Sequence, residues 1–112
     1  MLILKIFRSD EWAALQAAGR TTGAPIDRDD GYIHFSTPAQ VGVTAAKYFA
    51  ETEGLMLIAC DADTMGAALR WEVSRGGDLF PHLYRELTLE DVLWAKPLPC
   101  GPDGHVFPRE AQ

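Results

Sequence analysis

Cysteine is scarce in this chain, with only Cys60 and Cys100 among 112 residues. Small domains that depend on disulfides contain many more cysteines and reside in oxidising compartments. Cys60 lies in an apolar run and Cys100 in a loop rich in proline and glycine, which differs from a disulfide framework. The sequence therefore predicts a reducing, cytoplasmic environment.

Long apolar runs are absent as well. A helix that crosses a bilayer needs roughly 20 apolar residues in succession, whereas the apolar opening of the chain covers only residues 2–7. Charge follows this run at once, and no small-residue cleavage site is present, so it differs from a signal peptide. We therefore expect no membrane-spanning segment and interpret residues 2–7 as a strand.

Basic residues are fewer than acidic ones. Ten lysines and arginines against sixteen aspartates and glutamates give a net charge of -6, and this charge argues against nucleic acid as a partner. Apolar residues make up 47% of the chain and charged residues 23%, which is typical of globular domains. We expect a single domain over residues 1–112 with one core.

Strands and helices of unequal length alternate along the predicted structure. Besides 2–7, strands are predicted at 32–36, 55–60, 70–73, 80–84 and 92–97. Helices are predicted at 10–18 and 37–51, and a short helix or helical turn at 61–69. Regular βαβ units are too few for a doubly wound sheet, so this order predicts an α+β fold. The run at 55–60 is expected at the centre of the core, and Pro81 favours an edge strand or an irregular strand for its segment.

Capping residues define the ends of the predicted helices. Ser9 is expected to cap the first helix and Gly19 to end it. Thr37, Pro38 and Gln40 form a strong start for the second helix. The side chains expected to be buried on that helix are Val41, Ala45, Tyr48 and Phe49. Between the first helix and the second strand, the glycine- and aspartate-rich segment 20–31 predicts a long polar surface loop.

His34 is the best single candidate for chemistry. In an extended segment, Ile33 and Phe35 share one face, and Tyr32, His34 and Ser36 share the other. The second face therefore collects groups that form hydrogen bonds. An imidazole there could act as an acid or a base near neutral pH, or it could satisfy a turn carbonyl on a solvated face.

A second histidine lies between two aromatic residues. Phe80, His82 and Tyr84 share one face of an extended segment, which would suit a flat ring or a sugar. The alternative is an edge strand whose rings pack on the rim of the domain. Both interpretations remain open from the sequence.

Glu72 alternates with Trp71 and Val73 along a predicted strand. If these two neighbours face the core, Glu72 faces the other side and could meet His34 or His82. Its carboxylate could then orient an imidazole or act as a base. A lone glutamate on a strand is otherwise a solvated edge residue.

Motifs for several other chemistries are missing. Neither CxxC nor HxxxH spacing occurs, so the sequence predicts no metal site. Gly76-Gly77 indicates a turn rather than a nucleotide-binding loop, and there is no Gly-x-Ser-x-Gly elbow. Ser36 shares a face with His34, but the third member of a hydrolytic triad is not visible.

Two segments resemble the signature of the bacterial domain-of-unknown-function family number 952. They are residues 30–37, with Gln40 and Thr44-Ala45 after them, and residues 80–84. The resemblance also includes Lys5-Ile6, Trp12 and the stretch 69–72, and it covers nearly the whole chain. This family is similar in fold to the ADP-ribosyltransferases, whose two small, split sheets hold a nicotinamide dinucleotide between them.

The resemblance implies small split sheets, antiparallel or mixed, with two to three short helices, and it implies NAD as a possible ligand. In such a site His34 would hydrogen-bond a ribose, Tyr84 would stack on nicotinamide, and Glu72 would bond the ribose 2'-hydroxyl. The nearby carboxylate would stabilise an oxocarbenium-like state as nicotinamide leaves. The other expected ligand-binding residues are Tyr32, Ser36, His82 and Arg70.

Several functions nevertheless remain open. An enzyme of this type would bring His34, Glu72 and Tyr84 to one cleft, whereas a non-catalytic binder of a nucleotide-like molecule would lack a carboxylate near the reactive carbon. A structural domain would fill this face with side chains. The chain lacks the Arg…Ser-Thr-Ser…Glu-x-Glu and His…Tyr…Glu patterns of known branches. The sequence leaves the substrate, turnover and the oligomeric state undecided.

An RNA 2'-phosphotransferase is a further branch of the same fold. Such an enzyme needs an arginine cluster to bind phosphate, and Arg70, Arg75 and Arg85 lie near the candidate segments. The net negative charge argues against an RNA partner.

Overall fold

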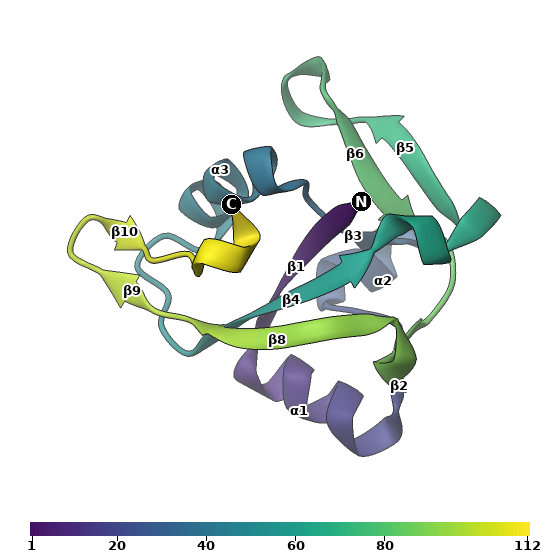
Figure 1. Ribbon diagram of the computed structural model, residues 1–112, viewed down its shortest axis with the longest axis horizontal. Coiled ribbons are helices and arrows are strands. Elements are labelled where there is room, and N and C mark those ends of the chain that lie inside the picture. The colour runs from purple at the N-terminus through teal and green to yellow at the C-terminus, as the bar shows by residue number, and fades with distance from the viewer.

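Strand β4 (Leu55–Asp61) is the middle strand of a three-stranded sheet with the order β1-β4-β8. The computed structural model describes the backbone of residues 1–112 and every side chain except that of Arg75. β1 (Leu2–Arg8) and β8 (Val92–Leu98) both pair with β4 in the antiparallel sense (Figure 1). The predicted central strand is therefore confirmed.

Apolar clusters cover both faces of β4. One cluster contains Ile58 and Cys60 of β4, and the other contains Leu55, Leu57 and Ala59. Buried partners in the first cluster are Ile3, Phe7, Leu15, Ile33, Phe35, Met65, Leu83 and Leu87. Buried partners in the second are Leu4, Ile6, Val41, Ala45, Leu98 and Ala111. A strand buried on both faces needs a continuous apolar run, and this is why β4 could be identified from the sequence.

A second antiparallel sheet has the order β3-β6-β5. Its strands are β3 (Ile33–His34), β6 (Leu79–Leu83) and β5 (Leu69–Val73). The prediction of an edge position for residues 80–84 is wrong, because β6 is the middle strand. Pro81 has no backbone N–H, so its backbone can only accept a hydrogen bond. It is tolerated in the middle strand because its carbonyl accepts the Phe35 N–H at 3.0 Å, and β3 ends at His34, one residue before Phe35.

One backbone bridge joins the two sheets. Ser36 exchanges two hydrogen bonds with Leu4 of β1, at 2.7 and 2.8 Å. The chain therefore stops pairing with β6 after Phe35, and the next residue pairs with β1, the edge strand of the other sheet. This crossing places the residues after β3 next to the middle of β1.

The helices α1 (Ser9–Ala18) and α3 (Pro38–Tyr48) lie close to their predicted positions. Gly19 ends α1 in the left-handed conformation, as expected. Ser9 is not the cap, because it is already the first helical residue; instead the Glu11 carboxylate accepts the Arg8 backbone N–H at 2.8 Å. On α3, Val41 and Ala45 are buried, but Tyr48 is exposed because α3 ends there and turns it to solvent.

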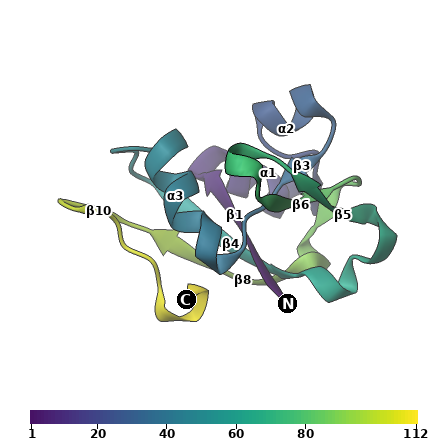
Figure 2. The same ribbon diagram turned by 90° about the horizontal axis from the view of Figure 1, so that it is seen from above.

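The prediction of a long surface loop at 20–31 is wrong. This segment contains the short strand β2 (Arg20–Thr21), which pairs with β7 (Leu87–Thr88), and the helix α2 (Pro25–Asp30). Figures 1 and 2 show α2 beside β3. Six residues are too few for an apolar period to appear, so the helix gives no amphipathic signal in the sequence.

The condition considered for Glu72, that its neighbours Trp71 and Val73 face the core, does not hold, since these residues are 38% and 70% exposed. The predicted turn at 61–69 is confirmed as two short 3₁₀ segments, Ala62–Thr64 and Gly66–Ala68. Near the C-terminus, β9 (Cys100–Gly101) and β10 (Gly104–His105) form a small hairpin.

The α+β class is thus confirmed, with three α-helices and only antiparallel pairing along the described backbone. Among the described residues, no helix has the length and apolar character to cross a bilayer.

The two thiols are expected to differ in reactivity. Cys60 has no exposed surface, and burial raises the pKa of its thiol to about 12, whereas Cys100 is half-buried in the hairpin. Because the thiolate is the reactive species, Ellman's reagent at pH 8 should titrate one thiol in the native protein and two in denaturant. The Cys100→Ser variant is the control and should show no fast native reaction. Two native thiols reacting at equal rates would contradict the buried position of Cys60.

Candidate functional site

The Asp27 carboxylate is the most highly bonded acidic group described in the structure. It is 1% exposed, and its two oxygens accept hydrogen bonds from four donors on three residues. Oδ2 accepts from the Ala24 backbone N–H at 2.8 Å, and Oδ1 accepts from the His34 backbone N–H at 3.0 Å. The other donors are Lys5 Nζ and His34 Nδ1. Helix α2, which was not predicted from the sequence, brings Asp27 into this position.

Gly23 is required for the approach of Asp27 to its partners. Its φ of +99° lies in the left-handed region, and a Cβ built there would lie 2.3 Å from Asp27 Oδ2. Any larger residue would therefore displace the carboxylate. The glycine is part of the structural basis of the site.

Lys5 is a buried cation in the middle of β1. Its side chain is 7% exposed, and its Nζ lies 2.7 Å from Asp27 Oδ2 and 2.9 Å from Oδ1. Burial lowers the pKa of Lys5, and the charge of Asp27 opposes this effect. Burial would also raise the pKa of Asp27, but the hydrogen bond from His34 and the charge of Lys5 outweigh it and bring that pKa down to about 2. Asp27 is thus ionised at neutral pH.

The ionised Asp27 determines which nitrogen of His34 carries a proton. A carboxylate can only accept, and His34 Nδ1 lies 2.6 Å from Asp27 Oδ1, so Nδ1 is the donor. The other ring nitrogen, Nε2, lies 3.0 Å from Oδ2 of Asp30, which is 44% exposed at the end of α2. Nε2 is therefore the atom of His34 that a bound molecule can reach by displacing an exposed carboxylate.

A second carboxylate–imidazole pair lies on the neighbouring strands. His82 pairs directly with His34 across β3 and β6, and its Nδ1 lies 2.9 Å from Glu72 Oε1. The Tyr84 hydroxyl donates to the same oxygen at 2.6 Å. These hydrogen bonds lower the pKa of Glu72, and the Glu72 bond raises the pKa of Tyr84. His82 is 3% exposed, so its ring has little contact with bulk solvent.

Tyr32 lies against both imidazoles. Its ring stacks on His82 with centroids 4.2 Å apart, and its centroid lies 4.7 Å from that of His34 and 5.1 Å from that of Tyr84. The two imidazole centroids are 5.4 Å apart, with the rings edge to face. The four rings form one cluster, which we call the ring cluster: Tyr32, His34, His82 and Tyr84.

Two cavities adjoin the ring cluster. The larger, of about 730 Å³, is lined among others by Lys5, Tyr32, His34, Ser36 and His82. The smaller, of about 390 Å³, is lined among others by Asp27, Tyr32 and Tyr84. Tyr32 lines both cavities. The larger volume lies within the usual range for small-molecule sites, roughly 300–1,000 Å³.

The predicted site residues fall into three groups in the structure. Tyr32, His34, Ser36 and His82 line the larger cavity, as their shared strand faces predict. Tyr84 lines the smaller cavity instead. Glu72 and Arg70 are among the lining residues of neither, although Glu72 holds His82 and Tyr84, and the Arg70 guanidinium lies 4.7 Å from the Tyr84 ring. Glu72 therefore meets His82, and its bonded partners do not include His34.

Two important residues, Lys5 and Asp27, were not predicted from the sequence. Lys5 gave one usable signal: it is the only charge within the apolar run 2–7, and a buried charge requires a partner. Asp27 gave none, because nothing local distinguishes it from Asp29 and Asp30. Arg75 lies outside the described side chains. Among the side chains that are described, no group of three or more histidine, cysteine or acidic residues could hold a metal ion.

Loss of the Asp27 charge should destabilise the fold through Lys5. Asp27→Asn leaves the buried Lys5 ammonium without a countercharge, which should cost about 3–5 kcal/mol of unfolding free energy in urea titrations. Asp30→Asn, at the exposed end of the same helix, is the matched control and should cost less than about 1 kcal/mol. Adding Lys5→Met to Asp27→Asn should recover part of the loss; no recovery would argue against an ion pair as the cause.

The contribution of the Asp27 carboxylate to stability should also depend on pH. The folded pKa of Asp27, about 2, lies below its ordinary value of 3.8, so on acidification the unfolded chain takes up the proton first. The stabilisation is complete above about pH 4 and disappears as the pH falls toward 2, a loss of roughly 2 kcal/mol. Urea titrations at each pH should show that the difference in unfolding free energy between wild type and Asp27→Asn becomes smaller over this interval. A difference that stays constant with pH would contradict the assignment.

Comparisons with known proteins agree with this structure. The model of a family described as a protein of unknown function (DUF952) matches residues 6–95. The crystal structure of protein CC0527 from Caulobacter crescentus is similar, with 44% identity and a TM-score of 0.90 over 94% of this chain and 92% of that one. Its solution NMR structure has 44% identity and a TM-score of 0.84, covering 93% and 90%.

No curated protein matches the chain. The family match covers most of the chain and includes both histidines of the ring cluster. This chain therefore belongs to the DUF952 family of proteins of unknown function.

Proposed function

We propose that the protein is an enzyme that binds a small molecule with a flat ring in the larger cavity and transfers a proton through His34. The observation that carries this proposal is the buried, ionised Asp27, which fixes the His34 ring at 2.6 Å and keeps the proton on Nδ1. A carboxylate that orients an imidazole in this way is the usual support for a general acid or base. Nε2 is then the atom that exchanges a proton with the substrate.

Proton transfer would begin when the substrate replaces Asp30 at Nε2. With Nδ1 bonded to Asp27, a neutral His34 has a free lone pair on Nε2 and can accept a proton. The Asp27 carboxylate then stabilises the imidazolium that forms, and Lys5 keeps that carboxylate ionised. The residues thus supply a base, its orienting group and a buried countercharge.

The larger cavity also has groups suited to a ring and a sugar. Tyr32 and Phe80 provide aromatic surface, and Ser36 and Thr44 provide hydroxyl groups among its lining residues. Aromatic faces bind planar rings and sugars, and hydroxyls bind their polar edges. This mixture favours a nucleotide-like molecule over a purely apolar one.

NAD is the candidate substrate suggested by the analogy to ADP-ribosyltransferases, which rests on the sequence motifs alone. In that reaction His34 would bond a ribose hydroxyl, and a carboxylate would stabilise the oxocarbenium-like state as nicotinamide leaves; water would then add to the same ribose carbon and release a proton. Glu72 is engaged with His82 and Tyr84, so its part is to position the ring cluster. Asp30, which lines the larger cavity and contacts His34, is the better placed carboxylate.

A second candidate function is binding of a nucleotide-like molecule without turnover. The observation that favours it is the engagement of both His34 nitrogens, by Asp27 and Asp30. Both contacts are hydrogen bonds only when each nitrogen carries a proton, and such an imidazolium is a donor rather than a base. His34 would then recognise an acceptor on the ligand.

NMR of NAD in the presence of the protein tests these functions. We expect broadening of the NAD signals on binding and slow release of free nicotinamide. His34→Gln should lower the release rate about 100-fold or more, as expected for a lost proton-transfer group, and Asp30→Asn should lower it without abolishing binding. Val43→Ala, on the exposed face of α3, is the control and should leave both unchanged.

Three outcomes separate the candidates. Nicotinamide release that depends on His34 supports the enzyme. Binding that depends on His34, with no release, supports the non-catalytic binder. Neither binding nor release by the folded wild type would eliminate NAD as the ligand.

A further inference from the structure

Strand β5 forms the outer edge of its sheet. It pairs with β6 on one side, and no strand of the described backbone pairs with its other side (Figure 1). An exposed edge presents unpaired backbone N–H and C=O groups to which another strand can bond. The edge strand is five residues long, Leu69–Val73.

The pairing within the sheet shows which backbone groups face outward. Pro81 accepts from Phe35, so its backbone groups point toward β3, and those of Phe80 and His82 point toward β5. Trp71 is the residue opposite Pro81 in the β5–β6 register. In an antiparallel pair of this kind the Trp71 N–H and C=O point away from β6, to the free edge.

The sequence of β5 is complementary to itself. Read from either end, the strand is an aliphatic residue, a charge, Trp71, the opposite charge and an aliphatic residue. If two copies pair antiparallel about a two-fold axis at Trp71, Arg70 lies opposite Glu72 of the second copy, and Glu72 lies opposite its Arg70. Opposite charges in directly facing positions stabilise a strand pair, and like charges destabilise it.

The other face of the β5–β6 hairpin is apolar and exposed. Trp71, Val73 and Leu79 are 38%, 70% and 51% exposed, and Val73 and Leu79 are direct partners in the register. All three lie on the face opposite to the ring cluster, because residue positions alternate along each strand. Pairing of two β5 edges would bring two such surfaces together.

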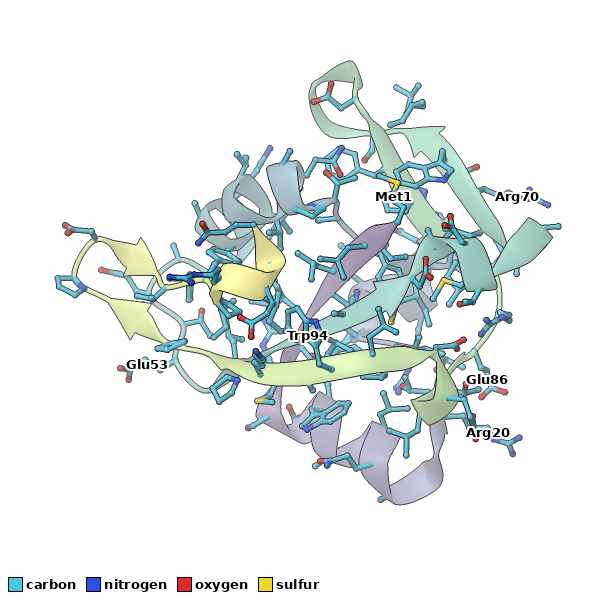
Figure 3. All side chains as sticks on the ribbon, viewed as in Figure 1. Met1, Arg20, Glu53, Arg70, Glu86 and Trp94 are labelled. Carbon is cyan, nitrogen blue, oxygen red and sulfur yellow. The ribbon has the colours of Figure 1, made fainter. Side chains whose placement is uncertain are left out.

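We infer that the protein forms a two-fold homodimer in which the β5 strands of two copies pair antiparallel, with Trp71 opposite Trp71. The two three-stranded sheets then form one six-stranded sheet, and the two Trp71 residues exchange their N–H and C=O groups. Figure 3 shows the Arg70 side chain at the outer side of the sheet, where its guanidinium also lies 4.7 Å from the Tyr84 ring of its own chain. This inference is independent of the proposed activity.

The dimer would also affect the ring cluster. Glu72 bonds His82 and Tyr84 in its own chain, and Arg70 of the second copy would add a positive charge beside it. Each copy would then help to orient the carboxylate that holds His82 in the other. A five-residue strand pair buries less surface than a standard interface of about 1,600 Å², so we expect a weak, reversible dimer.

Charge reversal at the two facing positions tests the inference by sedimentation equilibrium. Wild type should show a concentration-dependent monomer–dimer equilibrium. Arg70→Glu and Glu72→Arg should each weaken dimerisation at least tenfold, because both facing pairs become like charges. A variant with both substitutions restores opposite charges and should dimerise again.

Mixing provides the matched control. The Arg70→Glu and Glu72→Arg variants carry opposite charges at both positions, so an equimolar mixture should form a heterodimer although each variant alone is monomeric. Circular dichroism melting of each variant shows that the fold is kept. A wild type that stays monomeric up to millimolar concentration would overturn the inference, as would single variants that dimerise like wild type or a folded mixture that stays monomeric.

Discussion

The ion pair between Lys5 and Asp27 is the interaction on which the rest of the site depends. Lys5 comes from the first strand and Asp27 from the six-residue helix α2, and neither charge could remain buried without the other. Their pairing docks α2 against β1. This docking places the Asp27 carboxylate where it accepts hydrogen bonds from His34. A structural constraint, the neutralisation of a buried lysine, thereby creates an oriented imidazole.

The two histidines extend this principle across the sheet. His34 and His82 are direct partners on β3 and β6, and each is held at Nδ1 by a carboxylate from a different element. The orienting groups differ in exposure, because Asp27 is fully buried whereas the Glu72 side chain is 37% exposed. The first imidazole is therefore fixed by the core, and the second by contacts near the surface.

Local patterns predicted most of the fold and about half of the site. The apolar run of β4, the cap of α3 at Thr37 and the alternation around His34 are properties of a few neighbouring residues, so they can be read directly. Asp27 and Lys5 are 22 residues apart, and their pairing depends on tertiary structure that no local pattern encodes. The position of Pro81 in a middle strand was missed for a similar reason, since it depends on where the partner strand ends.

The bridge between Ser36 and Leu4 has a mechanical consequence. Phe35 is bonded to β6 and the next residue is bonded to β1, so two consecutive residues tie one sheet to the other. If one sheet slides along the other, the backbone of Phe35 and Ser36 must change, and these two residues directly follow His34. A shift of one sheet relative to the other would therefore act first on the backbone next to His34.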